Sequence, residues 1–349
     1  MNLFRKLKNK PALFFSTTGM TLDRFEQLMP AFEAVYNDLE AQRKRRVIKT
    51  GAERQRKAGG GAHFATELAE RLLMLMLYYR LYLTQEFMTL LFPVENRSSI
   101  CRAIAQMRPV FEAVLPVPER ARKTVLSLAE KETERRRRRI NSVEDFIEQY
   151  PELSILIDGV EQPKQRPKDK NKRKSDYSGK KRRHALKQIV TAAAKGIILD
   201  QSPSVGGRTH DFEAFKAHVA TRWFDGAGIE GSAPYEQLRA LRIVATTDSG
   251  FTGIDKLSLP IATRLVERAR RGHPLTSEQK VLNRVRSRER VQIEHTIGRR
   301  KQYRIASGIY RNADKDYDAA MNVVAGLVNL RAYDRIAAQT GVDLLVAGI

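Results

Sequence analysis

Two apolar runs that each close on an aspartate constrain the fold of this chain most strongly. They span residues 153–158 and 241–248, and both have the length and the aliphatic, β-branched composition of buried strands. Two more strands are predicted over 184–194 and 196–202, with a tight turn between them. Helical patterns separate and follow these strands, and such an order predicts an α/β domain built on a mixed sheet.

The N-terminal part of the chain has helical patterns instead. In a basic arm over residues 1–62, apolar residues at helical spacing predict one helix, over about 22–43. Residues 64–115 predict three helices, of which the second is short and capped by Thr84 and the third begins near Asn96. The buried face of that third helix is formed by Ile100, Ile104, Met107, Phe111 and Val114. A short helix, a tight turn and a helix with a polar, basic outer face favour a helix-turn-helix, although any small three-helix bundle has the same spacing.

Positive charge exceeds negative charge by a wide margin and is clustered. The chain carries 63 Lys and Arg against 40 Asp and Glu, which gives a net charge of +23. Residues 164–187 alone hold twelve Lys or Arg and two Asp, and further basic groups lie at 43–46, 135–139 and 284–301. Such clusters favour DNA as the partner, because Lys and Arg contacts to phosphates are the sequence-independent basis of nucleic-acid binding. For any single run, a solvated face or a flexible linker is the alternative.

The residues expected to contact DNA fall into two groups. Those on the outer face of the predicted recognition helix would read base edges, and they are Arg97, Ser98, Ser99 and Arg102. Those in the 164–187 run and the late helix would hold phosphates, and they are Lys180, Lys181, Arg182, Arg183, Arg299 and Lys301. A membrane is disfavoured as the partner, because no basic run has an apolar opposite face and no apolar run is long enough to span a bilayer. The single cysteine, Cys101, excludes a disulfide framework and a zinc site built on paired cysteines.

The two strand-end aspartates are also candidates for catalysis. An Asp at the carboxyl end of a strand points into the crevice where α/β sheets bind ligands, so Asp158 and Asp248 would lie side by side if their strands are neighbours. Glu294, on a helix predicted over 276–299, is the candidate third acid, and we expect it to be turned inwards. Carboxylates without paired Cys or clustered His favour hard ions such as Mg²⁺ or Mn²⁺. The alternatives are structural: turn or cap roles for the aspartates, and an i−4 ion pair between Glu294 and Arg290.

The residues around these acids resemble a known family. The segments that carry the likeness are Ile157-Asp158-Gly159-Val160-Glu161-Gln162-Pro163, Gln165-Arg166-Pro167, Tyr177-Ser178-Gly179-Lys180-Lys181-Arg182-Arg183-His184, His210-Asp211, Asp248-Ser249-Gly250-Phe251-Thr252-Gly253 and Glu294-His295-Thr296-Ile297-Gly298-Arg299. In this order they resemble bacterial insertion-sequence transposases of the DDE superfamily, in the branch that includes the eukaryotic Harbinger-type transposases. The likeness spans about residues 64–333, because that branch also carries a helix-turn-helix before its acids. Val160 and Ala185 stand where the family often has Thr, and Phe251 where it usually has Tyr, but no acid is missing.

The resemblance implies a fold and a chemistry. It implies a ribonuclease-H-like catalytic domain in which Asp158, Asp248 and Glu294 are the catalytic, metal-binding acids. Two Mg²⁺ ions, for which Mn²⁺ can substitute, would activate water to cut the element's ends and then the liberated 3′-hydroxyl to attack target DNA. Asp211 belongs to the family pattern and is also expected to cap the helix after it, so His210 and Asp211 are assigned a supporting role.

These observations predict the order of segments and the partners of the chain. The segments are a basic arm (1–62), a helix-turn-helix DNA-binding domain (63–118), a basic helical linker (119–150), a ribonuclease-H-like catalytic domain (151–333) and a C-terminal tail (334–349). The predicted protein is a cytoplasmic, nucleoid-associated bacterial transposase that binds the double-stranded terminal inverted repeats of its element and target DNA. Because two ends must be joined in one event, we expect a homodimer or a higher assembly. The alternatives are a ribonuclease-H-like nuclease without strand transfer and a non-catalytic helix-turn-helix regulator.

Overall fold

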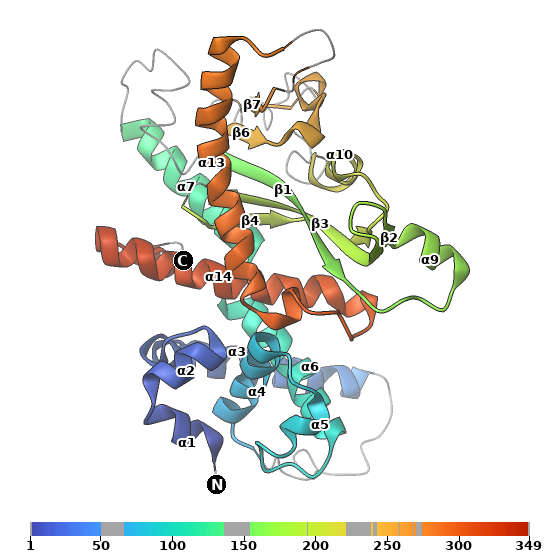
Figure 1. Cartoon of the computed structure of the whole chain (residues 1–349). Helices are drawn as coiled ribbons and strands as arrows, with labels where there is room; N and C mark the ends of the chain where they lie inside the picture. Colours follow the sequence, from blue (N-terminus) through green and yellow to red (C-terminus); the bar gives the residue numbers. More distant parts are fainter. Residues whose placement is uncertain are drawn as a thin grey trace. The chain divides into compact units, whose positions relative to one another are not determined.

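The chain forms two compact units. The computed structural model describes residues 2–49, 66–135, 154–193, 195–220, 239, 243–257, 259–267, 269 and 274–347, and Figure 1 labels their helices and strands. Unit 1 consists of Met1–Leu115 together with Gln302–Ala306, and unit 2 consists of Pro116–Lys301 together with Ser307–Ile349. Over these described ranges, no helix is both long and apolar enough to cross a bilayer.

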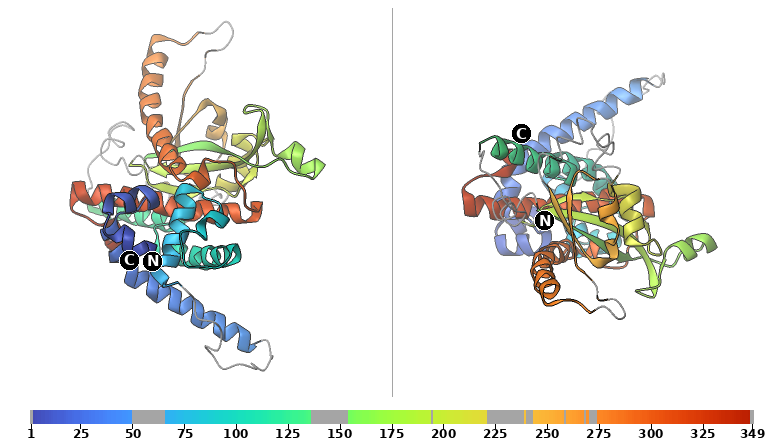
Figure 2. Two further views of the ribbon diagram at one scale, coloured as in Figure 1. Left: turned by 60° about the horizontal axis from the view of Figure 1, so that its bottom comes forward. Right: turned by 90° about the horizontal axis from the view of Figure 1, so that it is seen from above.

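Unit 1 is built from helices throughout its described residues. They are α1 (Leu3–Lys8), α2 (Pro11–Thr18), α3 (Leu22–Lys49), α4 (Leu68–Leu81), α5 (Gln85–Met88) and α6 (Arg97–Val114), with the 3₁₀ turn η5 (Arg304–Ala306). Helix α3 projects past α1 and α2 (Figure 2). A row of aromatic rings connects the first helices to α6, with centroid distances of 5.5 Å from Phe14 to Phe25, 6.3 Å on to Phe32 and 4.9 Å on to Phe111.

The N-terminal arm holds more structure than the sequence pattern predicts. The predicted helix is present as α3, but α1 and α2 precede it, and Phe14 and Phe25 are fully buried. Helix α2 starts at Pro11, whose fixed φ suits a first helical position, and ends at Gly19, which adopts a left-handed φ of 81°. Because α2 has only eight residues, it contains too few turns for the 3.6-residue period to be recognised in the sequence.

The three helices predicted before residue 115 are confirmed, and so are the Thr84 cap and the start of the third helix near Asn96. The Thr84 side chain accepts a hydrogen bond from Phe87 N (3.2 Å) at the start of α5, and Asn96 accepts one from Ser99 N (3.1 Å) at the start of α6. All five residues predicted for the inner face of α6 are buried. The outer face leaves Arg97, Ser98 and Arg102 exposed, and that arrangement suits a recognition helix.

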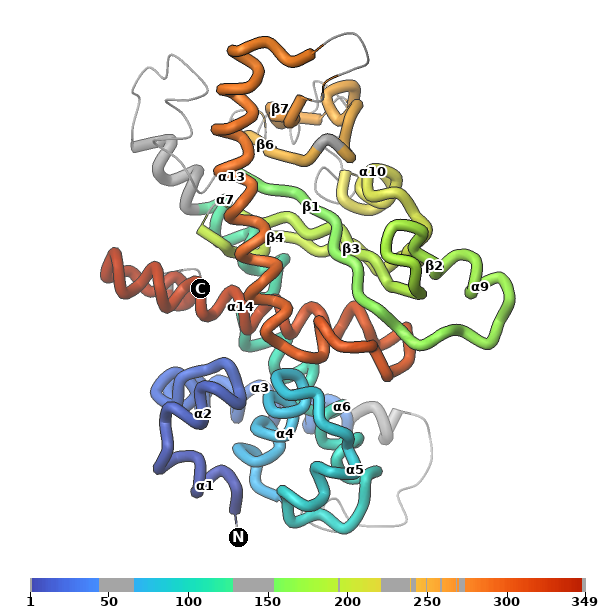
Figure 3. Tube along the Cα trace, viewed as in Figure 1, coloured from blue at the N-terminus to red at the C-terminus, as the bar shows by residue number. Residues whose placement is uncertain are grey.

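Unit 2 is an α/β domain on a mixed sheet, as the sequence predicts. Its strands are β1 (Ser154–Pro163), β2 (Tyr177–Ser178), β3 (Arg183–Ala193), β4 (Ile198–Gln201), β5 (Val205–Gly206), β6 (Val244–Thr247) and β7 (Ala262–Leu265). Their order is β2-β3-β1-β6-β7, and β4 and β5 also pair with β3. The β1–β3 pair is antiparallel, whereas β1–β6 and β6–β7 are parallel. The trace in Figure 3 follows β1 and β3 as a long pair that leads out towards α9 (Lys170–Ser175).

Helices cover both faces of this sheet. The remaining helices of unit 2 are α7 (Pro118–Arg135), α10 (Asp211–Ala214) with the π-helical turn η2 (Phe215–Ala220), α13 (Ser277–Lys301), α14 (Tyr317–Thr340) and α15 (Leu344–Ala347), with short 3₁₀ turns at η3 (Ser249–Phe251), η4 (Ile254–Lys256) and η6 (Asp314–Asp316). Ile157 and Ala245 face a core shared with α7, η2 and α14. The next residue along β6, Thr246, points the other way and donates a hydrogen bond to Glu289 of α13 (3.1 Å). Helix α13 therefore packs on the face opposite that core (Figure 1).

Two helices of unit 2 run across predicted segment boundaries. Residues 119–150 are predicted as a linker, but Ala121 and Val125 of α7 are buried in the core of unit 2, so this stretch begins inside the domain. Likewise α14 extends to Thr340, beyond the predicted end of the catalytic domain at residue 333. Both helices carry apolar residues whose partners lie on distant segments, and such partners cannot be identified from local periodicity. A short helix is also predicted from the capping residue Ser142 to Tyr150; it lies outside the described residues, as do residues 136–139 of the basic group at 135–139.

Candidate active site

Asp158 and Asp248 lie at the point where two parallel strands part. Strand β1 pairs with β6 from Ser154–Val244 to Ile157–Thr247 and no further. Asp158 and Asp248 are the residues that follow this last pair on the two strands. The strands that carry the two acids are therefore neighbours, which is the condition for bringing the acids together.

The setting of Asp158 differs from the expected one. Asp158 is not the last residue of its strand, because β1 continues to Pro163 against β3, where Asp158 pairs with Val190. The apolar pattern ends at Asp158 where the pairing with β6 ends, although the strand itself continues. The site is thus a mid-strand position beside the carboxyl end of a neighbouring strand.

Both carboxylates are anchored by backbone hydrogen bonds. Asp158 Oδ1 accepts from Gly159 N (2.8 Å), and Asp248 Oδ1 accepts from Gly250 N (2.8 Å), capping η3. The cap role considered for the aspartates from sequence is therefore present at Asp248. These backbone hydrogen bonds occupy Oδ1 of each carboxylate, and the Oδ2 atoms accept no hydrogen bond from the described residues.

The charge on Asp158 is poorly compensated. Burial is the largest cause of a rise in its pKa from 3.8 to about 6. The Gly159 hydrogen bond and the positive charge of Arg290 oppose this rise, whereas the negative charges of Asp248 and Asp211 add to it. Asp248 and Asp211 thus both act electrostatically on Asp158 at the end of the β1–β6 pair.

Asp211 belongs to this group through its side chain, and it is not the helix cap. His210 is the N-cap of α10, its Nδ1 accepting from Phe212 N (3.4 Å), and Asp211 is the first helical residue. The Asp211 carboxylate lies against the backbone of Gly159, where a Cβ atom would be 2.7 Å from its Cγ. Glycine at position 159 therefore permits the approach that brings Asp211 beside Asp158.

A buried lysine that the sequence interpretation assigns to a DNA-gripping run holds Asp211 in place. Lys187 Nζ lies 2.9 Å from Asp211 Oδ1 and 3.4 Å from Glu161 Oε1, and it donates to the Thr209 carbonyl (2.5 Å). Only 7% of the Lys187 side chain is exposed. Lys187 is therefore a positioning residue next to the acids. Its place within the predicted strand 184–194 is the signal that could have separated it from the exposed lysines.

Glu294 does not have the expected inward setting. Ile293 and Ile297 are buried, but Glu294, turned about 100° away from Ile293 on the helix, is exposed. It forms no ion pair with Arg290 among the described residues, and Arg290, one turn earlier, acts on Asp158. In the part of the chain that the structure describes, no three acidic, His or Cys side chains are gathered closely enough to hold a metal ion.

The basic residues predicted to contact DNA divide by burial. Lys180, Lys181, Arg182 and Arg183 are all exposed at the turn between β2 and β3, and Lys301 is exposed at the end of α13. Arg299 is half-buried, with a guanidinium nitrogen directly over Gly196. Two further cations of the same basic segments are not part of the exposed surface. Arg300 is buried and donates to Gln188 Oε1 (2.5 Å), and Lys164 is buried between Asp176 and Asp314.

The raised pKa of Asp158 predicts how the stability of the metal-free protein varies with pH. Below about pH 3.8 the Asp158 carboxyl is mostly protonated in both the folded and the unfolded state, so it does not affect stability. Between about pH 3.8 and 6 it ionises in the unfolded state but not in the folded state. The free energy of unfolding therefore falls over this range by up to about 3 kcal/mol. In a chelator at pH 7.5, Asp158→Asn should therefore raise the melting temperature by several degrees, and the gain should vanish near pH 4. Asp255→Asn, at an exposed position, is the control. An unchanged or lower melting temperature for Asp158→Asn at pH 7.5 would contradict this account of the site.

The chain is similar to known proteins over most of its length. Residues 157–329, which include Asp158, Asp248 and Glu294, match the model of a family described as DDE superfamily endonuclease. Over 283 residues the chain is 25% identical to a probable transposase for insertion sequence element IS702 from Microchaete diplosiphon, and the match covers 81% of this chain and 87% of that protein. No solved structure matches the chain. The Harbinger-related branch stays a prediction, but the matched family and relative agree with the motifs read from the sequence: the chain belongs to the DDE superfamily, among the transposases of bacterial insertion sequences.

Proposed function

We propose that this protein is a DNA transposase that cleaves the ends of its element and joins the liberated 3′-hydroxyl to target DNA. The observation that carries the proposal is the pair Asp158 and Asp248 at the end of the parallel β1–β6 pair, inside the segment that matches a DDE endonuclease. Helix α13, which carries Arg290 and the candidate third acid Glu294, packs against the same two strands. This arrangement supports a nuclease site whose acids are approached by a phosphate backbone.

The residues of the site suit divalent metal ions. The donors are carboxylates, which Mg²⁺ and Mn²⁺ prefer, and the raised pKa of Asp158, caused first by burial and then by the charges of Asp248 and Asp211, supports a site that a cation would stabilise. We propose that Asp158, Asp248 and Glu294 hold two such ions. When bound, such ions supply an activated attacking oxygen and stabilisation of the leaving oxygen in phosphoryl displacement. Lys187 then restricts the rotation of the Asp211 side chain through their ion pair, and the positive charge of Arg290 partly offsets the negative charge of Asp158.

An assay that separates cutting from joining tests the proposal. The full chain should nick a duplex carrying the element's terminal repeat in Mg²⁺ or Mn²⁺ and leave it intact in chelator. Supplied with pre-cut ends, it should also join their 3′-hydroxyls to a plasmid. Cleavage without joining would favour the nuclease alternative, and end binding with neither reaction would favour the non-catalytic regulator. Joining of two ends in one product would further support an assembly of at least two subunits.

Recognition of the element's ends is proposed for helix α6. Arg97 and Arg102 are exposed there while Ile100, Ile104 and Met107 are buried, so both arginines are available to base edges. Each Arg–guanine contact is worth about 1–3 kcal/mol of discrimination. Arg97→Ala and Arg102→Ala should therefore lower the preference for element ends over random DNA about 5- to 150-fold each, as measured by competition binding. Metal-dependent cleavage of a substrate in excess should survive. If both variants keep the full preference, α6 is not the element that reads the ends.

A further inference from the structure

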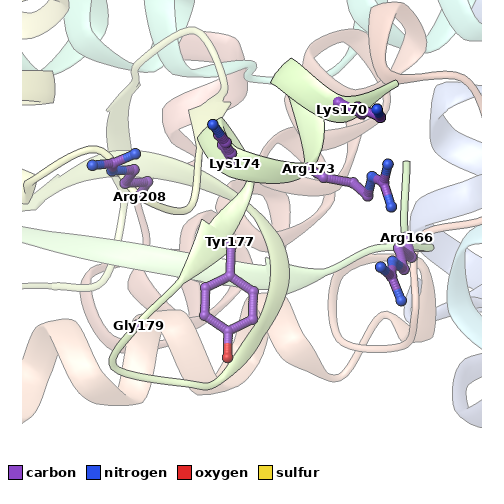
Figure 4. Close-up of a pocket in the computed structure, with 7 residues that line it drawn as sticks. All are labelled: Arg166, Lys170, Arg173, Lys174, Tyr177, Gly179 and Arg208. Carbon is purple, nitrogen blue, oxygen red and sulfur yellow. The ribbon is translucent and has the colours of Figure 1, made fainter. Parts of the chain in front are cut away.

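A cationic pocket lies on the part of unit 2 that carries α9, and none of its lining residues belongs to the acid site. Its volume is about 590 Å³, within the range of pockets that bind small ligands. The lining residues are Arg166, Lys170, Arg173, Lys174, Tyr177, Gly179 and Arg208 (Figure 4). Five of the seven are cations and none is acidic, so the pocket is suited to a polyanion.

The backbone around the pocket is held firmly. Asp169 caps α9 by accepting from Lys172 N (2.8 Å), and Arg208 N donates to the carbonyl of Ser175 at the other end of that helix (3.1 Å). Gly206 allows this approach, because a Cβ atom there would collide with Ser175 O. The lining residues therefore sit on a preformed scaffold, which lowers the entropic cost of binding.

The positive charge of the pocket is not neutralised by nearby acids. Asp176, which precedes Tyr177 in the chain, and Asp314 are both paired with the buried Lys164. None of the five lining cations makes an ion pair with any residue that the structure describes. Cations left uncompensated around a concave surface favour contact with phosphate groups.

Tyr177 makes the pocket more than a phosphate-binding surface. Its side chain is 43% exposed, and its backbone pairs with His184 on β3. The two rings meet edge to face at 5.5 Å, which holds the tyrosine ring in place. In Figure 4 the ring stands between Arg208 on one side and Arg166 and Arg173 on the other. An exposed aromatic ring flanked by cations is the combination that binds single-stranded nucleic acid.

We propose that this pocket binds a nucleotide of an unpaired DNA strand, with its base stacked on Tyr177 and its flanking phosphates on Arg166, Arg173 and Arg208. Bases inside a duplex have both faces covered by their neighbours, so only an unpaired base offers a face to the ring. Cutting and joining create strand ends that can supply such a base. The inference rests on the proposed function, which makes DNA the polyanion.

Binding of the full chain to matched DNA probes in chelator tests this inference. One probe is a blunt duplex, and the other is the same duplex with a short single-stranded extension; both are followed by fluorescence anisotropy. The wild-type chain should prefer the extended probe about tenfold or more. Tyr177→Ala should lose this preference with little change for the blunt duplex, and Tyr177→Phe should keep it, because stacking needs the ring and not the hydroxyl. Arg208→Ala should weaken binding of the extended probe more than Lys256→Ala does, because Lys256 is an exposed cation outside the pocket.

The outcomes distinguish failure of the inference from failure of the proposed function. Tight but equal binding of both probes by the wild type would overturn the inference and leave the transposase proposal standing. If Tyr177→Ala weakens binding of both probes equally and keeps its melting temperature, the pocket is a general phosphate-binding surface, and the inference is again overturned. Tighter binding of an RNA extension would reject DNA as the ligand. Failure to bind either probe would overturn both proposals.

Discussion

Asp158→Ala, Asp248→Ala and Glu294→Ala should each abolish metal-dependent cleavage of an element-end duplex while leaving binding of that duplex largely intact. Removing one carboxylate ligand from a two-metal site removes several kcal/mol of transition-state stabilisation, so the cleavage rate should fall on the order of a thousandfold or more. End binding is assigned to α6 and the basic turn of unit 2, which the three substitutions do not touch. The measurements are the rate of nicking in Mg²⁺ and the dissociation constant of the same duplex in chelator.

Asp255→Ala is the matched control, because Asp255 is an exposed acid of the same unit and lies on η4 outside the site. It should cleave at the wild-type rate. Full activity of Asp248→Ala would reject the metal-site hypothesis. If only Glu294→Ala stays active, the third acid lies elsewhere, and Asp211, which already acts on Asp158, becomes the candidate.

Lys187→Met should destabilise unit 2 by about 3–5 kcal/mol, because it leaves two buried or half-buried carboxylates, Glu161 and Asp211, without their cation. The melting temperature of this unit should fall by roughly 10 °C. Loss of the lysine would also free the Asp211 side chain next to Asp158. Chemical unfolding at neutral pH in chelator, together with the thermal scan, measures the effect.

Lys216→Met provides the comparison for Lys187→Met. Lys216 makes an ion pair of 2.7 Å with Glu213, but both side chains are well exposed, so its removal should change stability by less than about 1 kcal/mol. Lys187→Arg should recover part of the loss by keeping the charge. Equal, small effects of Lys187→Met and Lys216→Met would show that Lys187 is a surface lysine in solution and not a positioning residue.

Elements with strong local signals were predictable from the sequence. Helices α4, α5 and α6 follow from apolar spacing, and the starts of α5 and α6 are marked by Thr84 and Asn96, because capping is a contact between residues three apart. Strands β3, β4 and β6 follow from short β-branched runs between turn residues. Short helices such as α1 and α2 escaped prediction, since six to eight residues hold too few turns for a period to show.

The acid site was predictable only in part. Asp158 and Asp248 stood out because each closes an apolar run, but their proximity depends on β1 and β6 being paired in parallel, which no local pattern states. The exposed setting of Glu294 depends on which face of α13 meets the sheet. The basic run over 164–187 also resembles one continuous surface in the sequence, although the side chains of Lys164 and Lys187 turn inwards from it.

Composition and local pattern alone indicate the kind of chemistry, because three separated acids, an excess of Lys and Arg and the order of helices and strands can be recognised without a fold. Strand pairing and burial settle which charges act together. Pairing of β1 with β3 and β6 brings Asp158, Asp248, Asp211 and Lys187 to one place from segments up to 90 residues apart, as the numbering of Asp158 and Asp248 shows. Burial then separates lysines that hold the protein together from those left to meet DNA, because a buried cation needs a carboxylate partner whereas an exposed one is already solvated by water.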